Sequence, residues 1–138
     1  MLTGADFFVF RLKPHDDLKK EISQVVQEKN ISAGIVVSCV GSLEQYHLRF
    51  ANQSTGIQHR GFHEILSLTG TISTNGIHLH MSVADTAGKV IGGHLLNDNL
   101  VYTTAEITLA IFRDVTFKRE HDPTYGYHEL VIQKKAQQ

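Results

Sequence analysis

The sequence predicts an α+β fold, a mainly antiparallel β-sheet with one principal helix. Only one stretch of the 138 residues has the apolar spacing of an amphipathic helix. About eight short segments are instead rich in β-branched and aromatic residues, as strands are. Tight turn signals such as Asn75-Gly76 separate some of them, and such turns join antiparallel neighbours. The length fits one domain, residues 1–138.

The first part of the chain predicts a strand and then the helix. Residues 6–12, DFFVFRL, have strand composition. We expect Asp16 and Asp17 in the first turn of the helix, where carboxylates favour the positive end of the helix dipole. The helix ends near Asn30. Its apolar stripe has the spacing i, i+4, i+7 and i+8, in Leu18, Ile22, Val25 and Val26.

The rest of the chain predicts strands joined by loops and turns. Residues 32–43 and 46–51 predict two strands, and the polar, glycine-containing segment 52–61 predicts a loop. A longer strand is expected over 62–73. Further strands are predicted at 77–85, 89–96, 100–113, 115–120 and 127–134.

Composition narrows the classes of function. The formal net charge is −1, which argues against a general polyanion binder, because such proteins carry a basic excess. A single cysteine, Cys39, cannot form an internal disulfide, and we expect it to be buried as a small apolar side chain. No apolar run approaches the roughly 20 residues of a membrane span. We therefore expect a cytoplasmic protein that does not enter membranes.

Three histidines stand in one short segment, GIHLHMSVADTAGKVIGGHL, residues 76–95. The stretch Asp85 to Gly88 has the pattern of a type I turn, followed by a glycine suited to the left-handed region. Pairing Asp85 with Lys89 places His80 directly opposite His94, because paired residue numbers in an antiparallel ladder keep a constant sum. His78 is two residues from His80, so it lies on the same face.

This register predicts a candidate metal site. The opposite face of the hairpin is apolar, with Ile77, Leu79, Met81, Val83, Ile91 and Leu95. His78, His80 and His94 therefore face away from the core, and three protein ligands leave a coordination position open. Zinc is the first candidate for a divalent ion, and iron, nickel and copper also accept imidazole. The alternative is a polar face of three histidines without a ligand.

Two carboxylates occupy strands that otherwise look apolar. Glu64 alternates with Phe62, Leu66, Leu68 and Ile72, so we expect it on the same face as these residues. Glu106 stands in a similar position within residues 100–113. Both can be paired structural residues. If the metal site is catalytic, either is a candidate proton carrier beside a metal-activated water, in a hydrolase or lyase acting on a small molecule.

Five of the other six histidines show no spacing that predicts a common site. They are expected at the surface: His15, His47, His59, His121 and His128.

The central part of the chain resembles a known family. EILSLTGTIS at 64–73, HLHMSVAD at 78–85, GKVIGGHL at 88–95 and VYTTAEITL at 101–109 are similar to the plant and prokaryote conserved (PPC) domain. The similarity extends from about residue 6 to residue 133. The resemblance implies an antiparallel α+β fold and a homotrimer, with the sheets packed around a threefold axis. It also makes the HLH and GGH histidines candidate metal ligands, as in stand-alone prokaryotic members.

The resemblance leaves the role open. Stand-alone members are often described as DNA-binding by analogy with plant proteins, in which an AT-hook beside the domain holds the DNA. This sequence contains no RGRP motif, and Phe62 and His63 stand where the plant pattern GRFEILSL has arginine and phenylalanine. We therefore weigh a metal-binding trimer of unassigned role, a DNA-binding or regulatory protein, a module that presents a surface to another protein, and a metal-dependent enzyme acting on a small molecule.

Overall fold

The computed structural model describes residues 1–135, which form one helix and eight strands. In chain order these are β1 (Ala5–Leu12), α1 (Leu18–Glu28), β2 (Gly34–Arg49), β3 (Ile57–Ser73), β4 (Gly76–Ala84), β5 (Val90–Leu95), β6 (Leu100–Phe112), β7 (Val115–Asp122) and β8 (Tyr127–Lys134). The predicted α+β class, mainly antiparallel with one helix, is confirmed.

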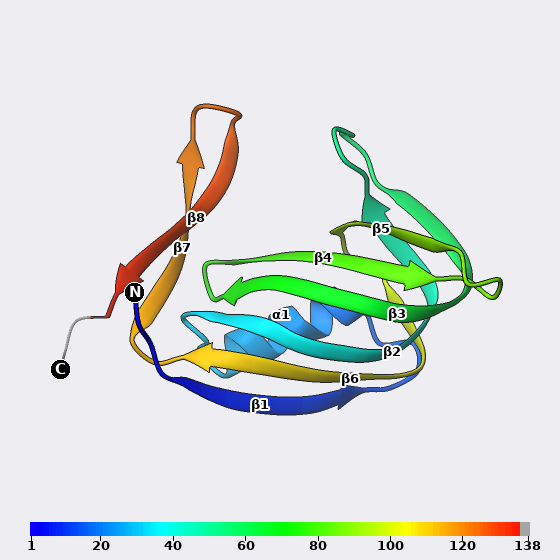
Figure 1. Ribbon diagram of the computed structural model, residues 1–138, viewed down its shortest axis with the longest axis horizontal. Helices are drawn as coiled ribbons and strands as arrows, with labels where there is room; N and C mark the ends of the chain where they lie inside the picture. Colours follow the sequence, from blue (N-terminus) through cyan, green and yellow to red (C-terminus); the bar gives the residue numbers. More distant parts are fainter. Residues whose placement is uncertain (136–138) are drawn as a thin grey trace.

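Six strands form a curved antiparallel sheet in the order β1-β6-β2-β3-β4-β5 (Figure 1). The end of β2 also pairs with β5, where Leu48 lies opposite Leu95 and Arg49 opposite His94. The strands β2, β3, β4 and β5 therefore close on themselves at one end of the sheet. This closure brings β2 beside β5, the strand that carries His94. The paired residues of the two strands lie 45 positions or more apart in the sequence.

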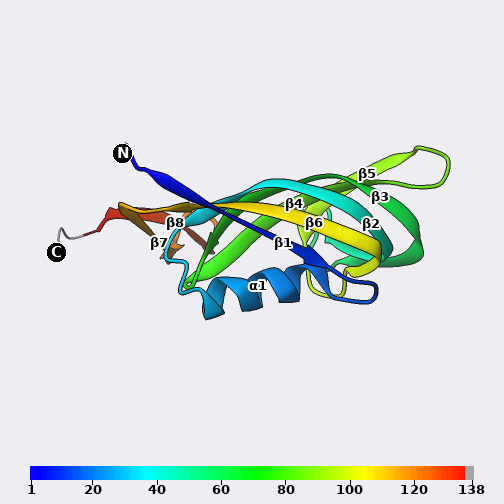
Figure 2. The ribbon, with the colours of Figure 1, turned by 90° about the horizontal axis from the view of Figure 1, so that it is seen from below.

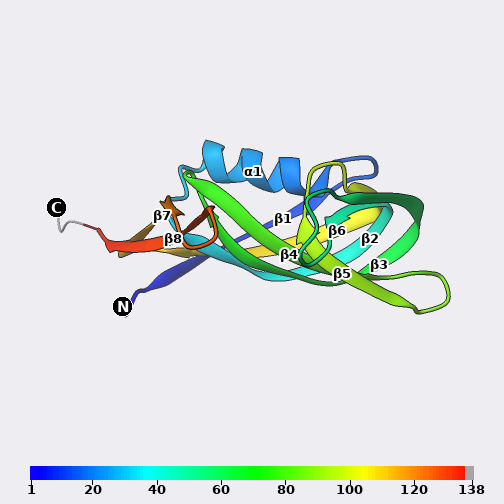
Figure 3. The ribbon, with the colours of Figure 1, turned by 90° about the horizontal axis from the view of Figure 1, so that it is seen from above.

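Helix α1 covers one face of the sheet (Figures 2 and 3). Leu18, Ile22 and Val26 of its apolar stripe are fully buried against the sheet. Asp16 and Asp17, expected in the first turn, both precede the helix, which begins at Leu18 after an extended backbone at Asp17. The Asp17 carboxylate accepts hydrogen bonds from the backbone N–H groups of Asp98 and Asn99, so it holds the β5–β6 loop instead of capping the helix.

Strands β2 and β3 are longer than predicted. The two strands expected at 32–43 and 46–51 are one strand with an irregular register near Leu43, and β3 extends back to Ile57. Tyr46 lies opposite His59 in this extension, so part of the segment predicted as a loop is paired. Pairing uses backbone groups, so a polar sequence does not prevent it.

Glu64 shares a face with Phe62 and Leu66 as expected, but not with Leu68 and Ile72, and a β-bulge explains why. The register of β3 against β4 shifts between Ile65 and Ser67, which reverses the alternation of side chains along β3. Leu68 is therefore buried, whereas Glu64 and Leu66 are exposed on the face away from the helix. Glu64 does not share the core face.

Strands β7 and β8 form a separate hairpin that stands beyond the end of the main sheet (Figure 1). A second small core, built on Ala33, Val115 and Phe117, attaches it. The Phe117 backbone N–H donates to the Ser32 carbonyl at 2.9 Å, and the Asn75 side-chain amide donates to the Phe117 carbonyl at 3.0 Å. These contacts place β7 beside the β3–β4 turn.

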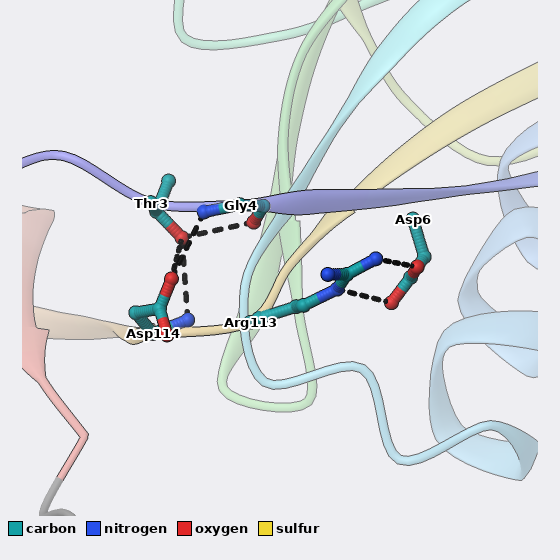
Figure 4. A network of polar contacts seen from close by, with 5 residues as sticks. All are labelled: Thr3, Gly4, Asp6, Arg113 and Asp114. Atoms are coloured by element: carbon teal, nitrogen blue, oxygen red, sulfur yellow. Dashed lines mark hydrogen bonds and ion pairs between the residues drawn. The ribbon is translucent and has the colours of Figure 1, made fainter.

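Polar contacts hold the start of β1 to the β6–β7 turn (Figure 4). The Asp114 carboxylate accepts from the Gly4 backbone N–H at 2.9 Å, and Arg113 forms an ion pair with Asp6. This ion pair lowers the pKa of the exposed Asp6 carboxyl.

Candidate metal centre

The β4–β5 turn has the geometry that the sequence predicts. The Asp85 backbone N–H donates to the Lys89 carbonyl at 3.0 Å, and Gly88 has a left-handed φ of 79°. The Asp85 carboxylate accepts from the backbone N–H groups of Ala87 and Lys89, each at 2.9 Å. This local network fixes the register, and His80 lies directly opposite His94 as expected.

The three histidines converge on the face that points away from the core. One ring nitrogen from each of His78, His80 and His94 lies within 4.8 Å of the others. Nε2 of His78 and Nε2 of His80 are 3.2 Å apart. A tetrahedral zinc ion with bonds of about 2.0–2.1 Å holds its ligand nitrogens about 3.3 Å apart. No other group of three histidine, cysteine or carboxylate side chains within residues 1–135 is this close.

The surroundings keep two of the rings neutral, which is the form that binds metal. Burial, together with the smaller effect of the Arg49 charge, lowers the pKa of His94 to about 4. Burial and the charge of Arg119 lower the pKa of His78, which Glu129 partly opposes. Nδ1 of His94 is buried without a hydrogen-bond partner among the described residues.

A cavity of about 660 Å³ lies beside the histidines. His78, His94 and Arg49 of β2 all line it. Arg119 and Glu129 come from the β7–β8 hairpin. A smaller cavity of about 250 Å³ reaches His80 and is also lined by Arg119 and Glu129. The cluster is therefore open to small molecules.

The two carboxylates that the sequence singled out lie elsewhere. Glu64 is opposite Ala84, four residues along β4 from His80, which is about 13 Å of extended strand. Glu106 is exposed on β6, opposite Arg11 and Val40. Neither lines either of the two cavities beside the histidines.

Sequence reasoning missed the residues that come from distant strands. Arg49, Arg119, His128 and Glu129 all line the larger cavity. The register of a hairpin could have paired His128 with His121, which lie opposite each other on β8 and β7. No local signal connects that hairpin to the three histidines.

Comparison with known proteins agrees with this architecture. The sequence model of the Plants and Prokaryotes Conserved (PCC) domain matches residues 2–113, most of the chain. The protein belongs to this family, which is the family that the central motifs resemble. The match ends before the β7–β8 hairpin, so the hairpin residues at the cavity lie outside it.

One curated relative is similar in sequence to nearly all of this chain but is a much longer protein. The chain is 44% identical over 130 residues to a Bifunctional protein GlmU from a Synechococcus species. The match covers 94% of this chain and 21% of that protein, so the chain spans about a fifth of the relative's length.

Solved structures share the whole fold. A hypothetical protein from Salmonella enterica has a TM-score of 0.96 and 32% identity, with 99% of each chain covered. A protein from Archaeoglobus fulgidus, named as metal-containing, has a TM-score of 0.81 and 25% identity, covering 94% of this chain and 95% of that one. A protein from Bacteroides thetaiotaomicron, named as a candidate for DNA binding, has a TM-score of 0.80 and 23% identity, covering 94% and 95%.

Within the described residues, no helix is both long enough and apolar enough to cross a membrane.

Proposed function

We propose that this protein binds one divalent transition-metal ion per chain through His78, His80 and His94. Zinc is the first choice, because three imidazoles with a free fourth position are a common zinc arrangement. The observation that carries the proposal is the convergence of three ring nitrogens within 4.8 Å on one rigid hairpin. The metal-containing relative from Archaeoglobus fulgidus supports it.

The geometry favours an exchangeable or catalytic ion over a closed structural one. Three protein ligands leave a coordination position for water or for another molecule, and the cavity beside His78 and His94 gives access to it. A bound ion would activate a water molecule at that position. Among the three glutamates considered, Glu129 lines the cavity, whereas Glu64 and Glu106 line neither of the two beside the histidines.

Elemental analysis of untagged protein tests the metal site. We expect about one metal ion per chain in the wild type and loss of that ion in His80→Ala. His15→Ala is the matched control, because the His15 side chain is 75% exposed and lies outside the cluster. A wild type that takes up no zinc, nickel, iron or copper even after incubation with each ion would refute the proposal.

We also propose that three chains assemble and that the assembly works in the cytoplasm. The face of the sheet away from the helix carries several apolar side chains that are half exposed or more. They are Phe7, Val9, Val37, Val40, Phe62 and Leu66. Exposed apolar patches of this kind mark contacts with other proteins, and the family resemblance suggests a second and third copy of this chain. A buried, free Cys39 suits a reducing compartment.

DNA binding is the second candidate function, and the name of the Bacteroides thetaiotaomicron protein is the observation that favours it. The net charge of −1 gives little general attraction to a polyanion. Gel retardation of duplex DNA at low salt would separate the two candidates, because DNA binding predicts a shift that weakens steeply as salt rises.

A further inference from the structure

Two arginines flank the histidine cluster on opposite sides. Arg49 on β2 lies directly opposite His94 on β5, and His94 lies opposite His80 on β4. Directly opposed side chains share a face of the sheet, so Arg49 continues the row of the two histidines. On the other side, Arg119 reaches from β7 to Thr71, which lies opposite His78.

Both guanidinium groups are held in position by one hydrogen bond each. Arg119 donates through Nη2 to the Thr71 hydroxyl at 2.6 Å, and Arg49 donates through Nη1 to the Gln53 carbonyl at 3.2 Å. A guanidinium has five N–H donors, so most of each fork is unused.

Within residues 1–135, neither arginine has a carboxylate partner. The ion pairs within residues 1–135 join His15 to Glu44 and Arg113 to Asp6, and they involve neither Arg49 nor Arg119. Both arginines are partly buried at the wall of the 660 Å³ cavity, where water is replaced in part by protein. Partly buried charges are stabilised by an opposite charge and by hydrogen bonds.

We propose that the cavity binds a small organic oxyanion, a carboxylate or phosphate compound held by Arg49 and Arg119 beside the histidine-bound metal. This rests on the proposed function in that one anion oxygen takes the open coordination position. The arginine forks match the planar or tetrahedral oxygen arrangement of such groups. Arg119 lies on the β7–β8 hairpin, outside the part of the chain that the family model matches. In this proposal the hairpin therefore contributes to the choice of ligand.

The charge and size of the cavity define the class of ligand. Two guanidinium groups and a divalent ion outweigh the single carboxylate of Glu129, which leaves the cavity positive. A volume of about 660 Å³ suits a small molecule and is within the usual range for ligand pockets. The Glu129 carboxylate can accept hydrogen bonds, which suits a ligand that also carries a hydroxyl or amino donor.

Binding of two simple probes to the 138-residue chain tests the proposal. Malonate and inorganic phosphate are titrated into cobalt-loaded protein by calorimetry, and neutral malonamide is the control ligand. We expect one or both anions to bind and to change the visible spectrum of the cobalt ion. The probe that binds more tightly indicates whether the cavity prefers a carboxylate or a phosphate. Arg49→Gln and Arg119→Gln should each weaken anion binding about tenfold to a hundredfold, the loss expected for charge-assisted hydrogen bonds.

Lys118→Gln is the matched variant, because it removes the same charge from the neighbouring position of β7, which points to the other side. It should leave anion binding unchanged. Failure of malonate and phosphate to bind, or equal binding to wild type and both arginine variants, would overturn the proposal. Metal content is measured on the same samples. Metal uptake without anion binding refutes this inference alone. Arginine-dependent anion binding in protein that takes up no metal refutes the metal site and the contact of the anion with it, and supports the two arginine contacts.

Discussion

Cys39 is a residue whose environment the sequence predicts correctly. It lies in the apolar β2 strand, is 7% exposed and belongs to the main core, as expected for a small apolar side chain. Burial raises the pKa of its thiol to about 12, because the thiolate is poorly solvated there. The nucleophilic form of the side chain is therefore suppressed in the folded protein.

Alkylation should follow unfolding of the protein. At pH 8.5 we expect iodoacetamide to label Cys39 slowly in the native protein and rapidly in concentrated urea, because only the unfolded chain exposes a thiol of ordinary pKa. The raised pKa also means that ionisation of Cys39 favours the unfolded state. Its contribution to stability is complete below about pH 9 and is lost as the pH rises toward about 12. Equal labelling rates with and without urea would contradict this assignment.

The β4–β5 hairpin shows which part of an element can be predicted locally. Its turn residues Asp85 and Gly88 fix the register through short-range hydrogen bonds, and that register determines that His80 lies opposite His94. The β-bulge in β3 could not be predicted in this way. It depends on how β3 pairs with its neighbours, and the alternation of apolar residues alone gave Glu64 the wrong face.

Two glycine substitutions distinguish the contribution of the β4–β5 turn from that of strand β3 to the position of the histidines. A Cβ at Gly88 would meet open space, so Gly88→Ala should cost only the strain of a left-handed residue, about 1–2 kcal/mol, in urea unfolding. A Cβ at Gly70 would lie 2.0 Å from the carbonyl oxygen of His78, and φ there is +141°. Gly70→Ala must therefore displace β4 at His78.

We expect Gly70→Ala to destabilise the protein more than Gly88→Ala and to weaken metal binding. Gly88→Ala should retain the metal, since the register of the hairpin is unchanged. Metal titration of both variants, after each is checked for folding by circular dichroism, measures this difference. A Gly70→Ala variant that folds and binds metal like the wild type would show that the backbone position of His78 is not critical.

At the scale of the whole molecule, the cavity is lined by residues of five strands, β2, β4, β5, β7 and β8. Arg49 reaches the histidines because β2 pairs with β5, and Arg119 and Glu129 reach them because the β7–β8 hairpin packs beside the β3–β4 turn. The Arg49 contact depends on the closure of the sheet, and the Arg119 and Glu129 contacts depend on the packing of the hairpin. The residues themselves carry no periodicity that indicates either arrangement, so the sequence predicts the three histidines and not their neighbours.

The assembly of the chain can be tested on the exposed apolar face of the main sheet. Val40 is 60% exposed there and Leu66 is 53% exposed. If three copies bury this face, the wild type should sediment at about 46 kDa, three times the 15.4 kDa of one chain. Val40→Glu should dissociate it to single chains, because an unpaired carboxylate in an apolar interface is strongly unfavourable.

Tyr125→Glu is the control, because Tyr125 is 84% exposed in the β7–β8 turn, away from that face. Analytical ultracentrifugation of the three proteins at equal concentration separates the outcomes. A wild type that sediments as a single chain at micromolar concentration would contradict the proposed assembly, because no second copy of the chain would then cover the apolar face.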